Sequence, residues 1–187
     1  MEGRPLQEHE LVRRAKEGDL AAYGDLVRLH QEAAFRLAYF ITRSREEAED
    51  AAQEGLMKAH RSLASFRDDA EFRPWVLRIV ANTAKNRVRS VVRRRRRELA
   101  VAVDPGSGDA APSPEPEAVA RVERERLLEA VDRLPERFRL VVVTRYLMDL
   151  SVAEAGEVLG VAEGTVKSRL SRALDRLRSD LGEDEGE

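Results

Sequence analysis

A segment rich in proline and glycine divides this chain of 187 residues into two stretches, and the division limits what either stretch can fold into. Residues 103–118 (VDPGSGDAAPSPEPEA) contain four prolines and two glycines, and Val103 is their only large apolar residue. This composition predicts an unstructured linker. We therefore expect one domain over residues 1–102 and another over residues 119–187, each with a modest core.

Apolar residues recur at helical spacing on both sides of the linker, and no stretch alternates in the manner of a strand. The sequence therefore predicts an all-α fold of two small helical domains. Asp19 is placed to cap a helix, and Ser44 and Ser151 each precede a Glu by three residues, the pattern of a capping box. We expect helices over residues 6–17, 19–42, 44–64, 73–97, 117–133, 135–148, 151–159 and 163–178.

Two of these helices have clear apolar stripes, which predict their buried faces. The stripe of the helix over residues 19–42 consists of Leu26, Leu29, Ala33, Leu37 and Phe40. The stripe of the last helix consists of Val166, Leu170, Ala173, Leu177 and Leu181.

The composition excludes several classes of protein. There are no cysteines, so disulfides and thiolate zinc sites are ruled out, and the three histidines lack the spacing of metal ligands. No apolar run approaches the roughly 18 residues that span a bilayer, and the N-terminus lacks the apolar core of a signal peptide. We expect a cytoplasmic protein without membrane insertion, metal, cofactor or catalytic residues; the oligomeric state when free stays open, with a monomer favoured.

Charge is segregated along the chain, so the net charge of −2 does not argue against nucleic acid. Residues 73–97 carry ten Lys or Arg and no Asp or Glu. Residues 44–71 carry eight acidic residues against four Lys or Arg. The basic stretch favours contact with a polyanion.

Residues 151–178 read as two short helices joined by a turn at Gly160, with the lengths of a helix-turn-helix. Opposite its apolar stripe, the second helix presents cations and hydroxyls that suit a major groove. A merely solvated cationic face is the alternative. The candidate contacts to duplex DNA are Thr165, Lys167, Ser168, Ser171, Arg172 and Arg176.

At this point the sequence resembles a known family. Residues 164–173 (GTVKSRLSRA) are similar to the region-four signature of sigma factors of the extracytoplasmic-function group, a branch of the sigma-70 family, and Leu134, Pro135 and Glu136 match its "LPE" motif. The resemblance implies that this helix reads the minus-thirty-five promoter element. The chain departs from the family at Ala155 and Gly156, and Gly predicts a softened helix there.

Residues 73–86 (RPWVLRIVANTAKN) resemble region two of the same family, which captures the opened minus-ten element in a pocket. The resemblance implies that residues 65–72 form this pocket, where aromatic rings either stack on a base or pack in the core, and we favour packing. The arginine run over residues 93–97 is expected to clamp phosphates or to be a solvated helix end. The candidate minus-ten contacts are Phe66, Asn82, Lys85, Asn86, Arg89, Arg93 and Arg94.

Residues 49–59 (EDAAQEGLMKA) resemble the family's segment for binding core RNA polymerase, with Gly55 and a nearby His60 as departures. Helical spacing places Asp50, Gln53, Glu54 and Met57 on one face, and these are the candidate contacts. An ordinary acidic surface helix is the alternative reading.

Together these features predict a two-domain transcription initiation factor that is not an enzyme. The resemblance implies that it binds core RNA polymerase and reads promoter DNA, both as a duplex and as an opened single strand; whether an anti-sigma factor restrains it stays open. A stand-alone helix-turn-helix regulator explains residues 151–178 equally well, but leaves the acidic helix without a role. A nucleic-acid enzyme needs clustered carboxylates or a phosphate-binding glycine loop, and the sequence shows neither.

Overall fold

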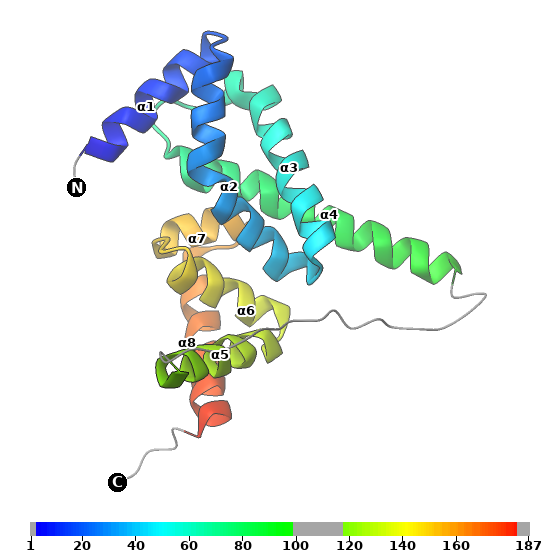
Figure 1. The fold of residues 1–187 in the computed structure, drawn as a ribbon. Helices are drawn as coiled ribbons and strands as arrows, with labels where there is room; N and C mark the ends of the chain where they lie inside the picture. Colours follow the sequence, from blue (N-terminus) through cyan, green and yellow to red (C-terminus); the bar gives the residue numbers. More distant parts are fainter. Residues whose placement is uncertain (1–2, 99–117, 183–187) are drawn as a thin grey trace.

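The computed structural model of the protein describes residues 3–98 and 118–182, and every element within these ranges is helical (Figure 1). The predicted all-α class is therefore confirmed. The predicted linker lies, except for Ala118, outside the described residues. The elements are α1 (Gly3–Lys16), α2 (Leu20–Thr42), α3 (Arg45–Ser62), the 3₁₀ turn η1 (Leu63–Ser65), α4 (Phe72–Glu98), α5 (Ala118–Arg133), α6 (Glu136–Val142), the π-helical turn η2 (Val143–Leu147), α7 (Val152–Leu159) and α8 (Glu163–Leu181).

Side-chain caps begin the helices largely where the sequence predicts. The Asp19 carboxylate accepts hydrogen bonds from the backbone N–H groups of Ala21 and Ala22 at the start of α2. Ser151 and Glu154 form the complete capping box at the start of α7. At α3 the predicted box is only half formed: Ser44 accepts from the Glu47 N–H, but the Glu47 carboxylate binds Arg87.

The first domain is built on α2, α3 and α4, which all contact one another, with α1 packed on α2 (Figure 1). Helices α3 and α4 approach closely at Gly55, where an added Cβ would lie 2.8 Å from the Val80 side chain. The predicted stripe of α2 is wrong at Leu29, which is 40% exposed. The buried positions of α2 instead include His30 and Ile41, because α1, α3 and α4 all pack on the helix and widen its buried face.

The second domain packs α5, α6 and α7 around α8. Gly160 ends α7 at a φ of 71° in the left-handed region, as the turn of the hairpin requires. Gly156 also has a packing role that its helix propensity does not reveal: an added Cβ would lie 2.8 Å from the Val161 carbonyl oxygen. The predicted stripe of α8 is wrong at Leu181, which is 37% exposed at the last turn, beyond the contacts with the other helices.

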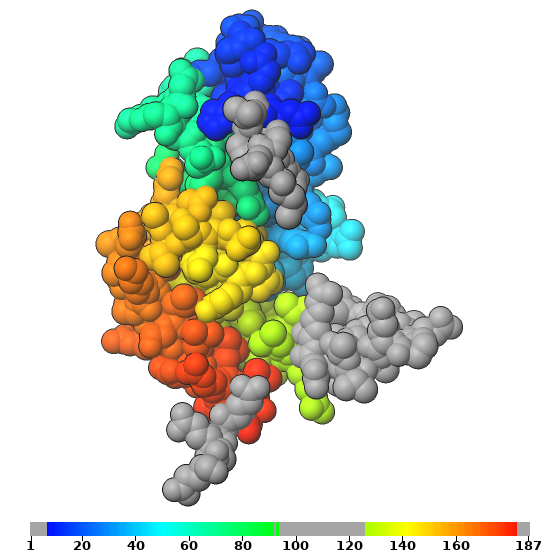
Figure 2. Space-filling model, turned by 90° about the vertical axis from the view of Figure 1, so that its left-hand side faces the viewer, coloured from blue at the N-terminus to red at the C-terminus, as the bar shows by residue number. Residues whose placement is uncertain are grey.

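The two domains lie against each other. Helix α7 packs on α4, and α6 with η2 packs on α2. In the space-filling view the second domain, yellow to red, abuts the first directly (Figure 2). The contact brings together segments that are more than 70 residues apart in sequence, including the side chain of Arg73 and the backbone of Met148.

Candidate nucleic-acid and polymerase interfaces

The face of α8 opposite its buried stripe is open to solvent. Lys167, Ser168, Ser171 and Arg172 are exposed, and Thr165 is half-buried in the first turn. The Arg176 guanidinium is also exposed but lies over the Phe138 ring, 5.1 Å from its centroid, which orients it. The structure therefore brings the six predicted duplex-reading residues onto one helix.

The predicted minus-ten flank of α4 is only partly open. Asn82, Asn86 and Arg89 are exposed along one side of the helix. Lys85 is half-buried, and its Nζ donates a hydrogen bond to the Leu159 carbonyl oxygen of α7 at 3.3 Å. Burial lowers the pKa of the Lys85 ammonium below its usual value. The second domain thus occupies one of the predicted DNA contacts.

The aromatic residues near the predicted minus-ten pocket pack in the core. Phe66, Phe72 and Trp75 are each at most 9% exposed. The Phe66 ring centroid lies 5.0 Å from that of Trp75 and 5.7 Å from that of Phe72. In this structure Phe66 offers no free ring face to a base, so packing is the alternative that the structure shows.

A contact that sequence reasoning missed ties down the loop before α4. Lys16 in the last turn of α1 donates to the Phe66 carbonyl oxygen at 2.8 Å and pairs with the Asp68 carboxylate at 2.6 Å. No local pattern signals this contact, because its partners are about 50 residues apart.

Of the two arginines predicted to contact DNA beyond the α4 flank, Arg93 is exposed. The side chain of Arg94 lies outside the described residues.

The predicted polymerase-binding face of α3 is exposed at Asp50, Gln53 and Met57, while Glu54 is half-buried. The cation that organises this face lies on another helix, so local patterns could not predict it. Arg87 of α4 reaches across to carboxylates on three successive positions of this face, at 2.8 Å to Glu47, 2.6 Å to Asp50 and 3.4 Å to Glu54.

The same ion pairs shift two pKa values on this face. The hydrogen bond to Glu47 raises the pKa of Arg87, while Lys58 and then Arg87 lower the pKa of Glu54. The lowered pKa favours the ionised form of the Glu54 carboxylate. Next to them Leu20, Val27, Leu56 and Met57 line an apolar groove of about 480 Å³ between α2 and α3.

Comparison with known proteins assigns each of the two domains to a known protein family region. Residues 26–96 match Sigma-70 region 2, and residues 124–177 match Sigma-70, region 4. The chain is 36% identical to the ECF RNA polymerase sigma factor SigM of Mycobacterium tuberculosis over 92% of its own length and 84% of that protein. It is 32% identical to the ECF RNA polymerase sigma factor SigW of Bacillus subtilis over 91% of its length and 94% of that protein.

The fold is also similar to that of a solved sigma factor, RpoE of Bartonella quintana, determined with the anti-sigma factor NepR. The TM-score is 0.70 at 24% identity, over 87% of this chain and 98% of that one. Within the described ranges, no helix has the length and apolar character needed to cross a membrane. The chain belongs to the extracytoplasmic-function group of sigma-70 family RNA polymerase sigma factors, non-enzymatic factors that direct RNA polymerase to promoters.

Proposed function

We propose that this sigma factor acts through three surfaces, one for each step of promoter recognition. Helix α8 reads the minus-thirty-five duplex, the flank of α4 captures the opened minus-ten strand, and α3 docks on core RNA polymerase. The proposal places residues 1–102 and 119–187 as the two working domains, joined by a linker over residues 103–118. Its action is placed in the cytoplasm, where the chromosome and polymerase are.

The observation that carries the proposal is the one-sided exposure of cations and hydroxyls on α8 in a capped helix-turn-helix. Arg172 and Lys167 project from the exposed face, whereas Val166 and Ala173 are completely buried beneath it. Arg can bind guanine through two acceptors, and Lys and Ser suit phosphates. A stand-alone regulator shares this feature, so polymerase dependence is the property that separates the two functions.

The decisive experiment is run-off transcription with purified core polymerase and a library of promoters. The protein should give transcripts from a subset of promoters, and core polymerase alone should give none. Arg172→Ala should relax the preference at one upstream position and cost about 1 to 3 kcal/mol on the cognate sequence. The control is Arg178→Ala, an exposed arginine paired with Asp175 and outside the reading face. Equal loss on every sequence would assign Arg172 to phosphate contact.

The polymerase-binding surface has its own test. The double variant Asp50→Asn/Glu54→Gln keeps side-chain shape but removes two charges from the α3 face. We expect roughly tenfold weaker binding to core polymerase, which corresponds to about 1.4 kcal/mol. The matched control is Glu46→Gln/Glu49→Gln on the same helix, and both of its positions are exposed. Unchanged affinity in the first variant would remove this face from the interface.

An anti-sigma factor is a further expected partner. The support is limited to the fold likeness with RpoE, which was solved with its anti-sigma factor NepR.

A further inference from the structure

Helix α1 packs along the loop over residues 66–71, which joins η1 to α4. Glu8, Val12 and Lys16 follow one another at four-residue spacing, so they share one face of the helix. Glu8 and Val12 line a small cavity together with Phe66 and other residues of the loop. Lys16, at the end of this face, reaches the loop with its ammonium group. The first helix of the chain therefore supports the loop before α4.

We propose that Lys16 is a positioning residue for capture of the opened minus-ten strand. It holds the loop before α4 in place at Phe66, and it cancels the charge of Asp68, which otherwise repels the DNA backbone. The inference rests on the proposed function of α4 and on the family resemblance that assigns the loop to the same step. It goes beyond that function, because the match to Sigma-70 region 2, over residues 26–96, does not include α1.

The Lys16 ammonium makes three contacts with the loop. It donates hydrogen bonds to the Phe66 carbonyl oxygen at 2.8 Å and to the Asp68 carboxylate at 2.6 Å. It also lies 5.9 Å from the centroid of the Phe66 ring, within the range of a cation–π contact. Only 21% of the Lys16 side chain is exposed, so the packing around it restricts its position. The loop is therefore held at a defined place on α1.

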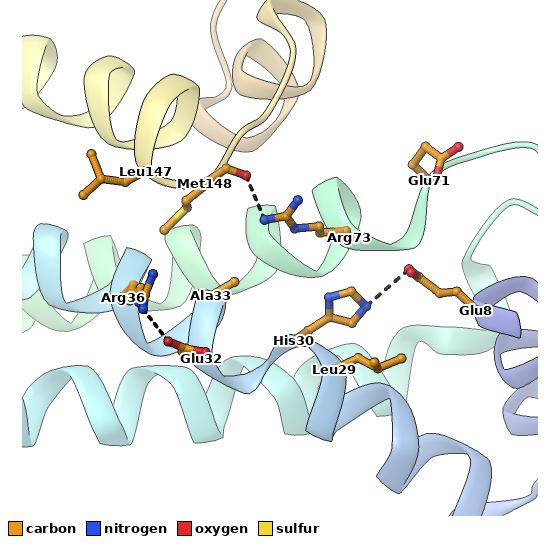
Figure 3. Close-up of a pocket in the computed structure, with 10 residues that line it drawn as sticks. All are labelled: Glu8, Leu29, His30, Glu32, Ala33, Arg36, Glu71, Arg73, Leu147 and Met148. Atoms are coloured by element: carbon orange, nitrogen blue, oxygen red, sulfur yellow. Dashed lines mark hydrogen bonds and ion pairs between the residues drawn. The ribbon is translucent and has the colours of Figure 1, made fainter. Parts of the chain in front are cut away.

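The other end of the same helix face is anchored to α2. The Glu8 carboxylate lies 3.2 Å from Nε2 of His30 (Figure 3), and His30 is buried. The His30 ring in turn lies 5.4 Å from the ring of Phe72, the first residue of α4. Glu8 and Lys16 are eight residues apart, which is about 12 Å along a helix. Helix α1 is therefore fixed to the first domain at Glu8 and gives the loop a fixed point at Lys16.

The loop carries an excess of negative charge for a segment that meets DNA. Residues 66–71 contain three acidic residues and one arginine. That arginine, Arg67, pairs with Asp69 at 2.6 Å, whereas the cation beside Asp68 comes from α1. The Asp68 side chain is 84% exposed, so a DNA phosphate that approaches the loop meets its charge. Without Lys16 the loop would present an uncompensated carboxylate to a polyanion.

The test measures binding of the holoenzyme to forked DNA, which is duplex through the minus-thirty-five element and single-stranded across the minus-ten element. The DNA comes from a promoter that the run-off library yields. Lys16→Met keeps the apolar stem but removes the charge and the hydrogen bonds, and it should weaken binding to forked DNA about fivefold. Binding to core polymerase and to an isolated minus-thirty-five duplex should stay within about twofold. An equal loss on all three, or no loss on forked DNA, would overturn the inference.

A second substitution tests the role of charge. Asp68→Asn alone keeps the bond between Lys16 and the Phe66 carbonyl, so it should not weaken binding to forked DNA. Added to Lys16→Met, it should tighten binding at least twofold, because the repelling carboxylate is gone. No gain in the Lys16→Met protein would overturn the neutralising role. A loss in Asp68→Asn alone would also overturn it, because the carboxylate itself would then contact the strand.

The matched control removes another cation from the same helix. Arg13 is exposed and pairs with Glu10 and Glu17 of α1 and its end, not with the loop. Arg13→Met changes the net charge by the same amount as Lys16→Met, and it should leave binding to forked DNA within about twofold. A fivefold loss in this control would show that any cation on α1 has the same effect, which contradicts a positioning role for Lys16.

Failure of the proposed function is recognised separately. A wild-type holoenzyme that binds neither forked nor duplex promoter DNA would refute that function. The hold on the loop is then decided by hydrogen exchange in the free protein, at the backbone N–H groups of Phe66 and Ala70, which donate to the carbonyls of Leu63 and Arg67. Both groups should exchange at least fivefold faster in Lys16→Met, and unchanged exchange would overturn the hold.

Discussion

Helix α4 has two neighbours that it holds in different ways. Against α3 it makes a close apolar contact in which Gly55 lies on Val80, and an added Cβ would approach the Val80 backbone to 2.9 Å. Against α7 its polar contacts are the side chains of Lys85 and Arg78, which reach a carbonyl and a carboxylate. The first contact cannot open without exposing apolar surface, whereas groups in the second regain water when it opens. One helix thus carries a permanent contact and a separable one.

The largest effect should come from adding a side chain at the permanent contact, where Gly55 of α3 lies on Val80 of α4. Gly55→Val forces a side chain into the Val80 backbone, and overpacking of this kind should lower the free energy of unfolding of the first domain by about 3 kcal/mol. Urea unfolding followed by circular dichroism measures it. The control is Gly24→Ala in α2, where an added Cβ meets only the Arg28 guanidinium at 3.7 Å, and a gain of about 0.5 kcal/mol is expected. An unchanged free energy of unfolding in Gly55→Val would show that α3 and α4 can accommodate a larger side chain at this contact.

The hairpin of the second domain contains a permanent contact of the same type, at the Val161 carbonyl. Gly156→Ala should move the α7–α8 turn and destabilise this domain by about 2 kcal/mol. It should also weaken binding to a minus-thirty-five duplex while leaving polymerase binding unchanged. Gly164→Ala is the stability control, because an added Cβ there meets nothing within 4 Å. If Gly156→Ala and Gly164→Ala changed the free energy of unfolding equally little, the close approach to Val161 would not explain why position 156 holds a glycine.

The separable contact should respond to much smaller changes. Arg43, which follows α2, pairs with Asp132 of α5. Arg43→Ala removes this partly exposed pair and should destabilise the contact between the two domains by about 0.5 kcal/mol, roughly a twofold change in the ratio of docked to separated domains. Fluorescence energy transfer between labels on the two domains measures this ratio, and added salt should shift it in the same direction. Arg45→Ala, which breaks an exposed pair within α3, should leave the ratio unchanged. A response to Arg45→Ala as large as that to Arg43→Ala would show that the Arg43 pair does not stabilise the contact between the domains.

The smallest effect concerns pH. Burial lowers the pKa of Lys85, with Arg89 and Arg169 acting in the same direction and Glu136 against it. Because burial against α7 disfavours the charged ammonium, the contact between the domains should strengthen as pH rises through the lowered pKa toward the usual value of 10.5. The same fluorescence ratio, measured from neutral to alkaline pH, tests this, and Lys85→Met should abolish the slope. A slope of opposite sign would mean that the charged form stabilises the contact.

Local rules predict many of the helix ends in this structure. The caps at Asp19 and Ser151 and the turn at Gly160 follow from backbone chemistry within a few residues, and the structure shows all three. The reading face of α8 follows from the helical period. What could not be predicted depends on contacts between distant segments, such as Arg87 with the acidic face of α3.

What local rules missed has the same origin. Gly156 reads as a weak point of a helix when only its propensity is considered, and its close approach to the Val161 carbonyl depends on the following turn. Leu29 fits the apolar stripe of an isolated helix, yet the positions of three neighbouring helices decide which side of α2 is covered. Glu47 completes a capping box by local rules, and Arg87 of a different helix captures it instead.

If the loop before α4 captures the opened minus-ten strand, as the family resemblance implies, the tie between Lys16 and the Phe66 carbonyl has a thermodynamic consequence for strand opening. A loop that must rigidify as it captures an extruded nucleotide loses conformational entropy at that moment, about 1 to 2 kcal/mol for each backbone residue fixed. Here α1 immobilises the loop at Phe66 and Asp68 during folding. Part of the ordering is therefore complete before any nucleic acid arrives, which leaves more of the binding free energy for unstacking the duplex.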